Sequence, residues 1–126
     1  MNKKTFALNA IIKYFKDNSL CGFQNSNCTY LTNDNKMCVV GQFMIDPSNY
    51  KWEGASIDHI LEQNLQDDVF KPEAVGILNI GEWRILQRIH DIIAVNEKRN
   101  FTSVLKKDIE FLDIFTFDEL VEFSQN

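Results

Sequence analysis

The stretch Asn27–Tyr50 constrains the fold more than any other part of the 126-residue chain. It carries two of the three cysteines and a cluster of turn formers, Thr32–Asn35. Asparagine and aspartate tolerate the left-handed backbone of tight turns, so the cluster predicts a hairpin between Asn27–Leu31 and Lys36–Gly41. Over Val39–Ile45 we expect a strand that passes into a short helical turn and ends ahead of the proline that follows.

Elsewhere, apolar residues recur every three or four positions, which is typical of helices. We predict helices over Thr5–Asp17, Ile57–Leu65 and Ile80–Asn96, with one further helical turn at Glu73–Leu78. A fourth helix, capped by Asn100 or Thr102, should run through Leu112. A last short helix should begin at a Thr116 capping box and run through Phe123. The most apolar of these, Ile80–Asn96, is expected to run through the core. The predicted fold is one α+β domain spanning residues 1–126, with four or five helices packed around one short β-hairpin.

The charge distribution narrows the class of partner. A net charge of −5 argues against nucleic acid, because phosphate binding needs surplus lysine and arginine. Six basic residues lie between Arg84 and Lys107, and the six charged residues after Lys107 are all acidic. Two interpretations stay open: the two segments pack together and neutralise one another, or the acidic C-terminal surface imitates nucleic acid or docks on a basic partner.

Cysteine usage and hydropathy indicate the compartment. Three cysteines is an odd count, and Met1–Phe15 lacks the continuous apolar core of a signal peptide. No run of the chain reaches the roughly eighteen apolar residues that a membrane span needs. We therefore expect reduced thiols, a cytoplasmic protein and no membrane partner.

The cysteines and histidines do not have the spacing of a compact metal site. Cys21, Cys28 and Cys38 lie seven to seventeen positions apart, and the histidines lie far downstream, so the short ligand pairs of structural zinc sites are absent. A site made of Cys28, Cys38 and His90 is the alternative to cysteines used as small apolar residues. We expect no metal and no cofactor.

Cys38 and His90 are the candidate catalytic residues. Cys38 precedes a turn from strand to helix at Gly41, where a helix N-terminus would lower the pKa of a thiol, and His90 is the available base. Asp91 is the next residue, and helix neighbours point about 100° apart, so we expect it to pair with Gln87 or Arg88 rather than orient His90. The opposing interpretation is that His90 belongs to the core face of its helix.

Exposed aromatic residues offer a candidate binding surface. Tyr30, Tyr50 and Trp52 fall on or beside the predicted hairpin and the loop after it, where contact sites tend to form. The alternative is that Tyr50 and Trp52 only cover the apolar face of the hairpin.

Two motifs occur together in the chain. The first runs from Cys28-Thr-Tyr30 through Cys38-Val-Val-Gly41 to Ile45-Asp-Pro47, and the second is the Leu-Gln-Arg-Ile-His-Asp segment that ends at Asp91. Over Asn27–Asp91 the chain thereby resembles small uncharacterised phage and prophage accessory proteins, although Gln42-Phe43-Met44 replaces a more aliphatic run. The resemblance implies a mobile-element protein working inside a bacterial cell, with Cys38 and His90 in one neighbourhood, and it carries over no catalytic residue.

These observations favour a non-enzymatic accessory protein. We expect it to bind a host protein or to sequester a small molecule, as an inhibitor of the anti-defence or immunity type, and its size suits a symmetric homo-oligomer. The alternative function is a cysteine-dependent hydrolase or transferase that uses Cys38 and His90.

Overall fold

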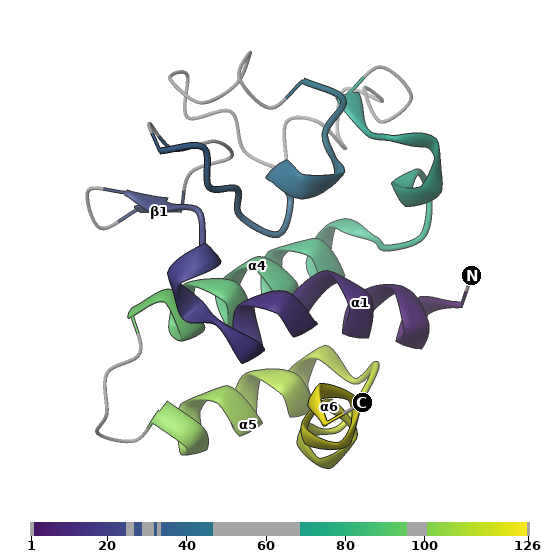
Figure 1. The fold of residues 1–126 in the computed structure, drawn as a ribbon. Helices are drawn as coiled ribbons and strands as arrows, with labels where there is room; N and C mark the ends of the chain where they lie inside the picture. Colours follow the sequence, from purple (N-terminus) through teal and green to yellow (C-terminus); the bar gives the residue numbers. More distant parts are fainter. Residues whose placement is uncertain are drawn as a thin grey trace.

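The computed structural model describes residues 2–24, 27–28, 32, 34–46, 69–95 and 101–125. Within these ranges the elements are α1 (Lys3–Lys16), η1 (Asn18–Leu20), β1 (Phe23–Gln24), β2 (Asn27–Cys28), η2 (Gly41–Phe43), η4 (Pro72–Ala74), α4 (Ile80–Val95), α5 (Phe101–Leu112) and α6 (Phe117–Ser124), where η denotes a 3₁₀ helix. Helices α1 and α4 lie side by side across the middle of the molecule, with α5 and α6 on one side of them (Figure 1). The segments around η2 and η4 lie on the other side.

The predicted helix over Thr5–Asp17 is confirmed, and α1 begins two residues earlier because Asn2 caps it. The Asn2 Oδ1 accepts a hydrogen bond from Thr5 N at 2.8 Å, which satisfies one of the free N–H groups of the first turn. On the buried face of α1, the Tyr14 hydroxyl donates to the Met37 carbonyl oxygen at 2.6 Å. This bond fixes the chain before η2 against α1.

The helix predicted over Ile80–Asn96 is confirmed as α4 and contacts both α1 and α5. Asn79 and Glu82 begin it with a reciprocal pair of hydrogen bonds, Glu82 N to Asn79 Oδ1 at 2.8 Å and Asn79 N to Glu82 Oε1 at 2.9 Å. Its inward face is almost completely buried and consists of Trp83, Leu86, Ile89, His90 and Ile93.

The two C-terminal helices are confirmed as α5 and α6. Between them Asp113 has a φ of 56°, a left-handed conformation that aspartate tolerates better than most residues. The predicted capping box is present, because Glu119 N donates to Thr116 Oγ1 at 3.0 Å and Thr116 N donates to Glu119 Oε1 at 2.9 Å. An ion pair between Lys4 and Glu119 joins α6 to α1.

The predicted α+β class, with a hairpin at its centre, is wrong. The described residues are mostly helical, and their strand pairing is limited to a two-residue antiparallel ladder between β1 and β2, with isolated bridges elsewhere. Cys28 pairs with Phe23 rather than with a strand after the turn. A turn does form, because Thr32 N donates to the Lys36 carbonyl oxygen at 2.8 Å. The chain then continues into further turns and η2 rather than into a strand. The predicted helix over Ile57–Leu65 lies outside the described residues.

The apolar run Cys38–Gly41 is completely or almost completely buried, and no strand among the described residues pairs with it. Its carbonyls at Cys38, Val40 and Gly41 accept from the N–H groups of Gln42, Phe43 and Met44. Contacts with the helices add to these local bonds, because Val40 N donates to Gln87 Oε1 of α4 at 3.2 Å and the Met37 carbonyl just before the run accepts from Tyr14 of α1. A buried apolar run of four residues has no periodicity that distinguishes strand from turn. Tertiary contacts therefore decide its conformation.

An aromatic cluster joins the η2 and η4 segments to the helices. The Trp83 ring centroid lies 5.9 Å from Phe6, 6.0 Å from Phe43 and 5.3 Å from Phe70. Backbone hydrogen bonds from Lys71 N to Phe43 O and from Ile45 N to Val69 O hold the two segments together. No helix in the described part of the chain is long and apolar enough to cross a membrane.

Candidate functional site

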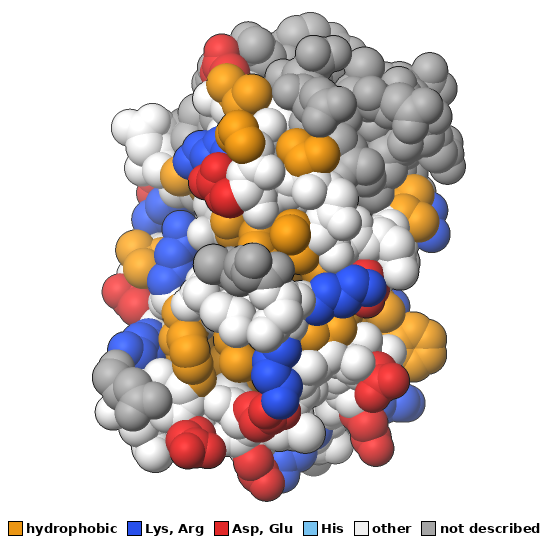
Figure 2. Space-filling model, turned by 90° about the vertical axis from the view of Figure 1, so that its right-hand side faces the viewer, with side chains coloured by type: hydrophobic (Ala, Val, Ile, Leu, Met, Phe, Trp, Pro, Cys, Tyr) orange, Lys and Arg blue, Asp and Glu red, His pale blue; other side chains and the backbone are white. Residues whose placement is uncertain are grey.

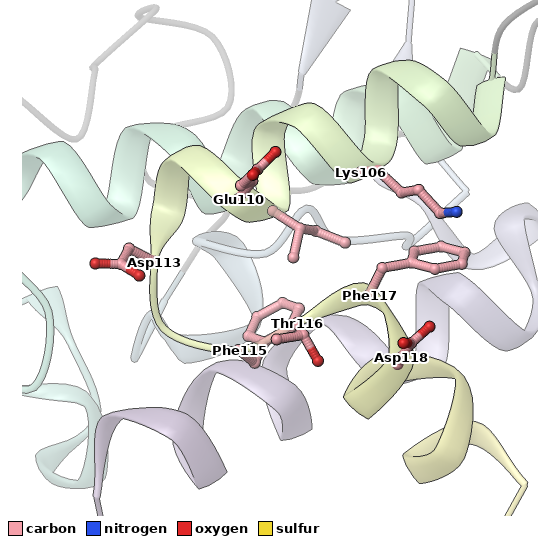
Figure 3. A pocket seen from close by; sticks show the side chains of 8 residues that line it. Lys106, Glu110, Asp113, Phe115, Thr116, Phe117 and Asp118 are labelled. Carbon is pink, nitrogen blue, oxygen red and sulfur yellow. The ribbon is translucent and has the colours of Figure 1, made fainter.

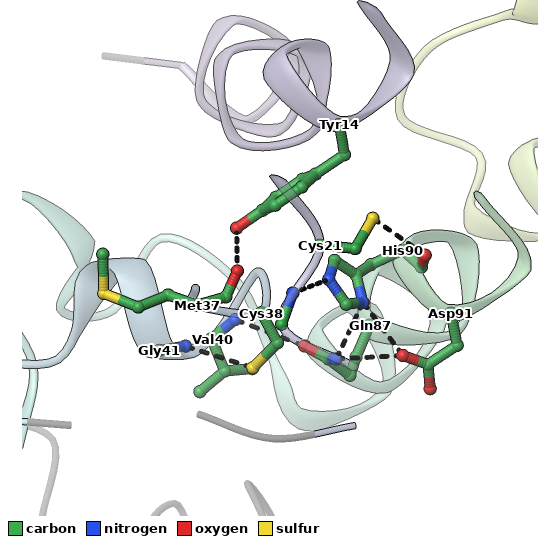
Figure 4. Close-up of polar contacts among 10 residues, drawn as sticks. Tyr14, Cys21, Met37, Cys38, Val40, Gly41, Gln87, His90 and Asp91 are labelled. Atoms are coloured by element: carbon green, nitrogen blue, oxygen red, sulfur yellow. Dashed lines mark hydrogen bonds and ion pairs between the residues drawn. The ribbon is translucent and has the colours of Figure 1, made fainter. Parts of the chain in front are cut away.

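His90 is the centre of a buried polar network (Figure 4). Its ring lies edge-on to Tyr14, with the centroids 4.7 Å apart. The Nε2 atom lies 3.2 Å from Gly22 N, which can only donate, so Nε2 accepts. The Nδ1 atom lies 2.9 Å from Asp91 Oδ1 and therefore carries the proton of the neutral ring. The network selects one tautomer of a neutral imidazole.

The prediction that Asp91 does not orient His90 is wrong. The 100° between helix neighbours separates the directions of their Cα–Cβ bonds, but Nδ1 lies on the ring edge nearest the backbone. Rotation of the half-buried Asp91 side chain brings its carboxylate to this nitrogen. The predicted contact of Asp91 with Gln87 is present at 3.4 Å, whereas Arg88 pairs with Asp108 at 3.1 Å.

Gln87 connects the His90 network to the apolar run before η2. Its Oε1 accepts from Val40 N at 3.2 Å, and its Nε2 donates to Asp91 Oδ1 at 3.4 Å. Gln87 Nε2 also lies 3.4 Å from His90 Nδ1. Both nitrogens carry hydrogen and cannot bond each other, so the Gln87 amide N–H donates to Asp91 instead. One side chain thus holds both the Cys38–Gly41 run and the carboxylate that fixes His90.

Cys38 is completely buried, and its Sγ accepts from Gly41 N at 3.4 Å. It lies just before a helical turn, as predicted, but that turn is a three-residue 3₁₀ helix. Gln87 bonds the backbone two residues after Cys38, at Val40 N, and also the Asp91 carboxylate that contacts His90. Among the described residues, no direct hydrogen bond joins the thiol to the imidazole, and the lone pair of Nε2 is occupied by Gly22.

Cys21, to which the sequence assigned no role, also belongs to this network. Its Sγ lies 3.9 Å from the His90 carbonyl oxygen. Burial raises the pKa of the Cys21 thiol to about 12, and the nearby Asp91 carboxylate adds to the effect. Since the thiolate is the nucleophile, this environment keeps Cys21 unreactive at neutral pH.

The other predicted site residues cannot be placed. Tyr30, Tyr50 and Trp52, the predicted binding residues, lie outside the described residues, as does the side chain of Cys28. Within the ranges that the structure describes, no group of three or more His, Cys, Asp or Glu side chains is arranged to hold a metal.

A cavity of about 380 Å³ opens between α5 and α6 and is called the α5–α6 pocket here (Figure 3). Its apolar wall consists of Ile109, Phe115 and Phe117, of which the first two are 1% and 4% exposed. Phe117 is fixed from behind by an edge-on contact with Phe15, with centroids 6.1 Å apart. The exposed rim consists of Lys106, Glu110, Asp113, Thr116 and Asp118.

The rim of the α5–α6 pocket carries surplus negative charge. Within the described part of the chain, no ion pair is formed by Glu110, Asp113 or Asp118, whereas Lys106 lies over the Phe117 ring, 5.1 Å from its centroid. Figure 2 shows acidic side chains at the end of the molecule where α5 and α6 lie, interspersed with lysine or arginine side chains and with exposed hydrophobic ones. The sequence signals of this pocket were the acidic run after Lys107 and the Thr116 capping box, but neither predicts a cavity.

The described residues define a small, mostly helical protein with a polar network around a buried histidine and an open acidic pocket. The chain matches no protein-family model, and no curated protein or solved structure is significantly similar to it.

Proposed function

We propose that this chain is a non-enzymatic accessory protein of a phage or mobile element that acts by binding a host protein, as an inhibitor of the anti-defence or immunity type. The observation that carries the proposal is the α5–α6 pocket, in which a largely buried apolar wall lies beneath exposed carboxylates that form no ion pair within the described ranges. Interfaces use such a combination, with an apolar centre and a polar rim. The resemblance over Asn27–Asp91 supports the phage origin.

The His90 network supports a binding role over a catalytic one. A cysteine nucleophile needs a base with a free lone pair, and Nε2 of His90 is already bonded to Gly22 N. Protonation of His90 would also place two donors, Nε2–H and Gly22 N–H, against each other. These contacts suit a buried imidazole that orders the core.

The test is affinity capture from bacterial lysate with the tagged protein, followed by binding measurements with the purified captured protein. We expect one host protein to be enriched over a tag-only control and to bind in the purified system with a defined stoichiometry. A capture experiment that yields no such protein, together with thermal stabilisation by a nucleotide or another small metabolite, would replace host-protein binding by small-molecule sequestration.

A further inference from the structure

We infer that the α5–α6 pocket receives a basic segment of the partner protein, with an apolar side chain against Phe115 and Phe117 and lysine or arginine side chains at the acidic rim. The inference rests on the proposed function and names the partner chemistry of its site. Three properties of the pocket support it.

The first property is a wall that is formed before any partner arrives. Phe115 is 4% exposed, and the Phe117 ring contacts both Phe15 and Lys106. The capping box at Thr116 and Glu119 fixes the start of α6 beside this wall. A preformed wall lowers the cost of ordering on association, so a short segment is enough to bind.

The second property is the charge of the rim. Two other carboxylates of these helices have cationic partners: Asp108 pairs with Arg88, and Glu119 pairs with Lys4. Glu110, Asp113 and Asp118 border the pocket and form no ion pair within the described ranges. The rim therefore carries three carboxylates and one lysine, and that lysine lies over an aromatic ring. The resulting negative potential at the pocket favours a cationic partner and repels nucleic acid.

The third property is the openness of the pocket, which favours a protein segment over a small molecule. Most of the lining side chains are exposed, and the deeply buried ones are Ile109 and Phe115. Sites for small molecules bury most of the ligand surface, and this pocket does not enclose its contents. A peptide segment gains the missing contact area by continuing along the exposed faces of α5 and α6.

The test uses a fluorescent helical peptide of lysine and leucine and a matched peptide in which glutamate replaces lysine. Binding to the full chain is followed by anisotropy, and the binding residues are mapped by NMR chemical-shift changes. We expect the lysine peptide to perturb the amides of residues 106–118 and the glutamate peptide to bind at least about tenfold more weakly. Perturbation confined to another surface, or equal binding of both peptides, would overturn the inference.

Matched charge reversals separate the pocket from the general acidity of the protein. Glu110→Lys changes a rim residue on the exposed side of α5, and Glu73→Lys makes the same charge change on η4. We expect Glu110→Lys to weaken binding of the lysine peptide about tenfold and Glu73→Lys to change its affinity less than twofold. Equal losses in both variants would show a non-specific charge effect and reject the pocket.

The two proposals fail in different ways. If the captured host protein binds Glu110→Lys as tightly as wild type, the function stands and the pocket is the wrong surface. If no host protein is captured while the lysine peptide still maps to residues 106–118, the pocket stands and the function is wrong. Octylamine serves as a small-molecule probe, and binding as tight as that of the peptide would overturn the choice of a protein segment.

Discussion

The two ring nitrogens of His90 illustrate how one buried residue acquires a defined chemical state. Gly22 N, sixty-eight positions away in the sequence, donates to Nε2 at 3.2 Å. The Asp91 Oδ1 accepts from Nδ1 at 2.9 Å. The helical spacing of α4 correctly places His90 on the buried face, which the sequence predicted as the alternative to a catalytic role. Its hydrogen-bond partners come from the tertiary fold and have no signal in local spacing.

Burial of Cys21 and Cys38 predicts slow reaction with thiol reagents. In a Cys28→Ser background only these two thiols remain, and they are 5% and 0% exposed. The raised pKa of Cys21 further lowers its thiolate fraction at pH 7. We expect both to label at least about a hundredfold more slowly than in urea, because labelling requires opening of the core.

The measurement is intact-mass analysis over time at neutral pH, with the urea-unfolded protein as the control. Fast, selective labelling of Cys38 in the folded protein would contradict this prediction and favour the cysteine-dependent enzyme over the binding protein.

At the scale of elements, α4 is expected to contribute most to stability. Trp83 and Leu86 are completely buried, and each packs between α4 and its neighbours. Trp83→Ala and Leu86→Ala should each lower the free energy of unfolding by about 3 kcal/mol, because each removes a large core side chain. The Trp83 Nε1 has no hydrogen-bond partner among the described residues, so the loss at this position is one of packing.

Urea denaturation of the variants measures this effect, and Val95→Ala is the matched control on the same helix. Val95 is 49% exposed, so its substitution should change stability by less than about 0.5 kcal/mol. Equal stabilities of Leu86→Ala and Val95→Ala would show that α4 is not central.

The start of α6 depends on the Thr116 capping box. Thr116→Ala removes the Oγ1 that accepts from Glu119 N at 3.0 Å, and it should cost about 1 kcal/mol. Thr5→Ala is the control, since Thr5 is an exposed helical threonine on α1. Chemical denaturation followed by circular dichroism compares the two variants, and a loss in Thr5→Ala as large as that in Thr116→Ala would argue against a specific effect of the cap.

The sequence predicted the long helices well and the segment before η2 poorly, for a physical reason. Helices α1, α4, α5 and α6 carry their own periodicity and capping residues, so local information is enough. The run Cys38–Gly41 is apolar throughout, and contacts from distant helices fix it in place: Gln87 of α4 bonds Val40 N, and Tyr14 of α1 bonds the carbonyl just before the run. A local pattern cannot contain those contacts, and the turn at Thr32–Asn35 was wrongly extended into a hairpin.

At the scale of the whole molecule, opposite charges join the helices in a different arrangement from the one expected. The basic segment 84–107 and the acidic C-terminal segment meet at the Arg88–Asp108 pair. Packing of these two segments therefore neutralises part of their opposite charges. Further pairs run instead to α1, from Lys3 to Glu82 and from Lys4 to Glu119. Of the carboxylates that form no ion pair within the described ranges, Glu110, Asp113 and Asp118 border the α5–α6 pocket, which is why its proposed partner is basic.

This arrangement predicts that the folded state loses stability in acid. The hydrogen bond from Lys4 and, next, the Thr116 N–H lower the pKa of Glu119 below its ordinary value of 4.5. Hydrogen bonds from Ser19 and Thr32 likewise lower the pKa of Asp17 and of Asp34 below 3.8. In each case the unfolded chain binds a proton more readily than the folded one, so the stabilisation is complete above about pH 5 and decreases as the pH falls below 4.5.

Glu119→Gln tests the contribution of one carboxylate to this acid dependence. The variant keeps a capping-box side chain but cannot ionise, so its free energy of unfolding should fall less steeply than that of wild type between pH 5 and pH 3. Urea midpoints measured at half-unit pH intervals give the slopes, and Glu73→Gln, an exposed carboxylate on η4, should keep the wild-type slope. If Glu119→Gln also keeps it, the Lys4–Glu119 pair does not link α1 to α6 energetically, and the packing of Phe15 on Phe117 must hold the two helices together.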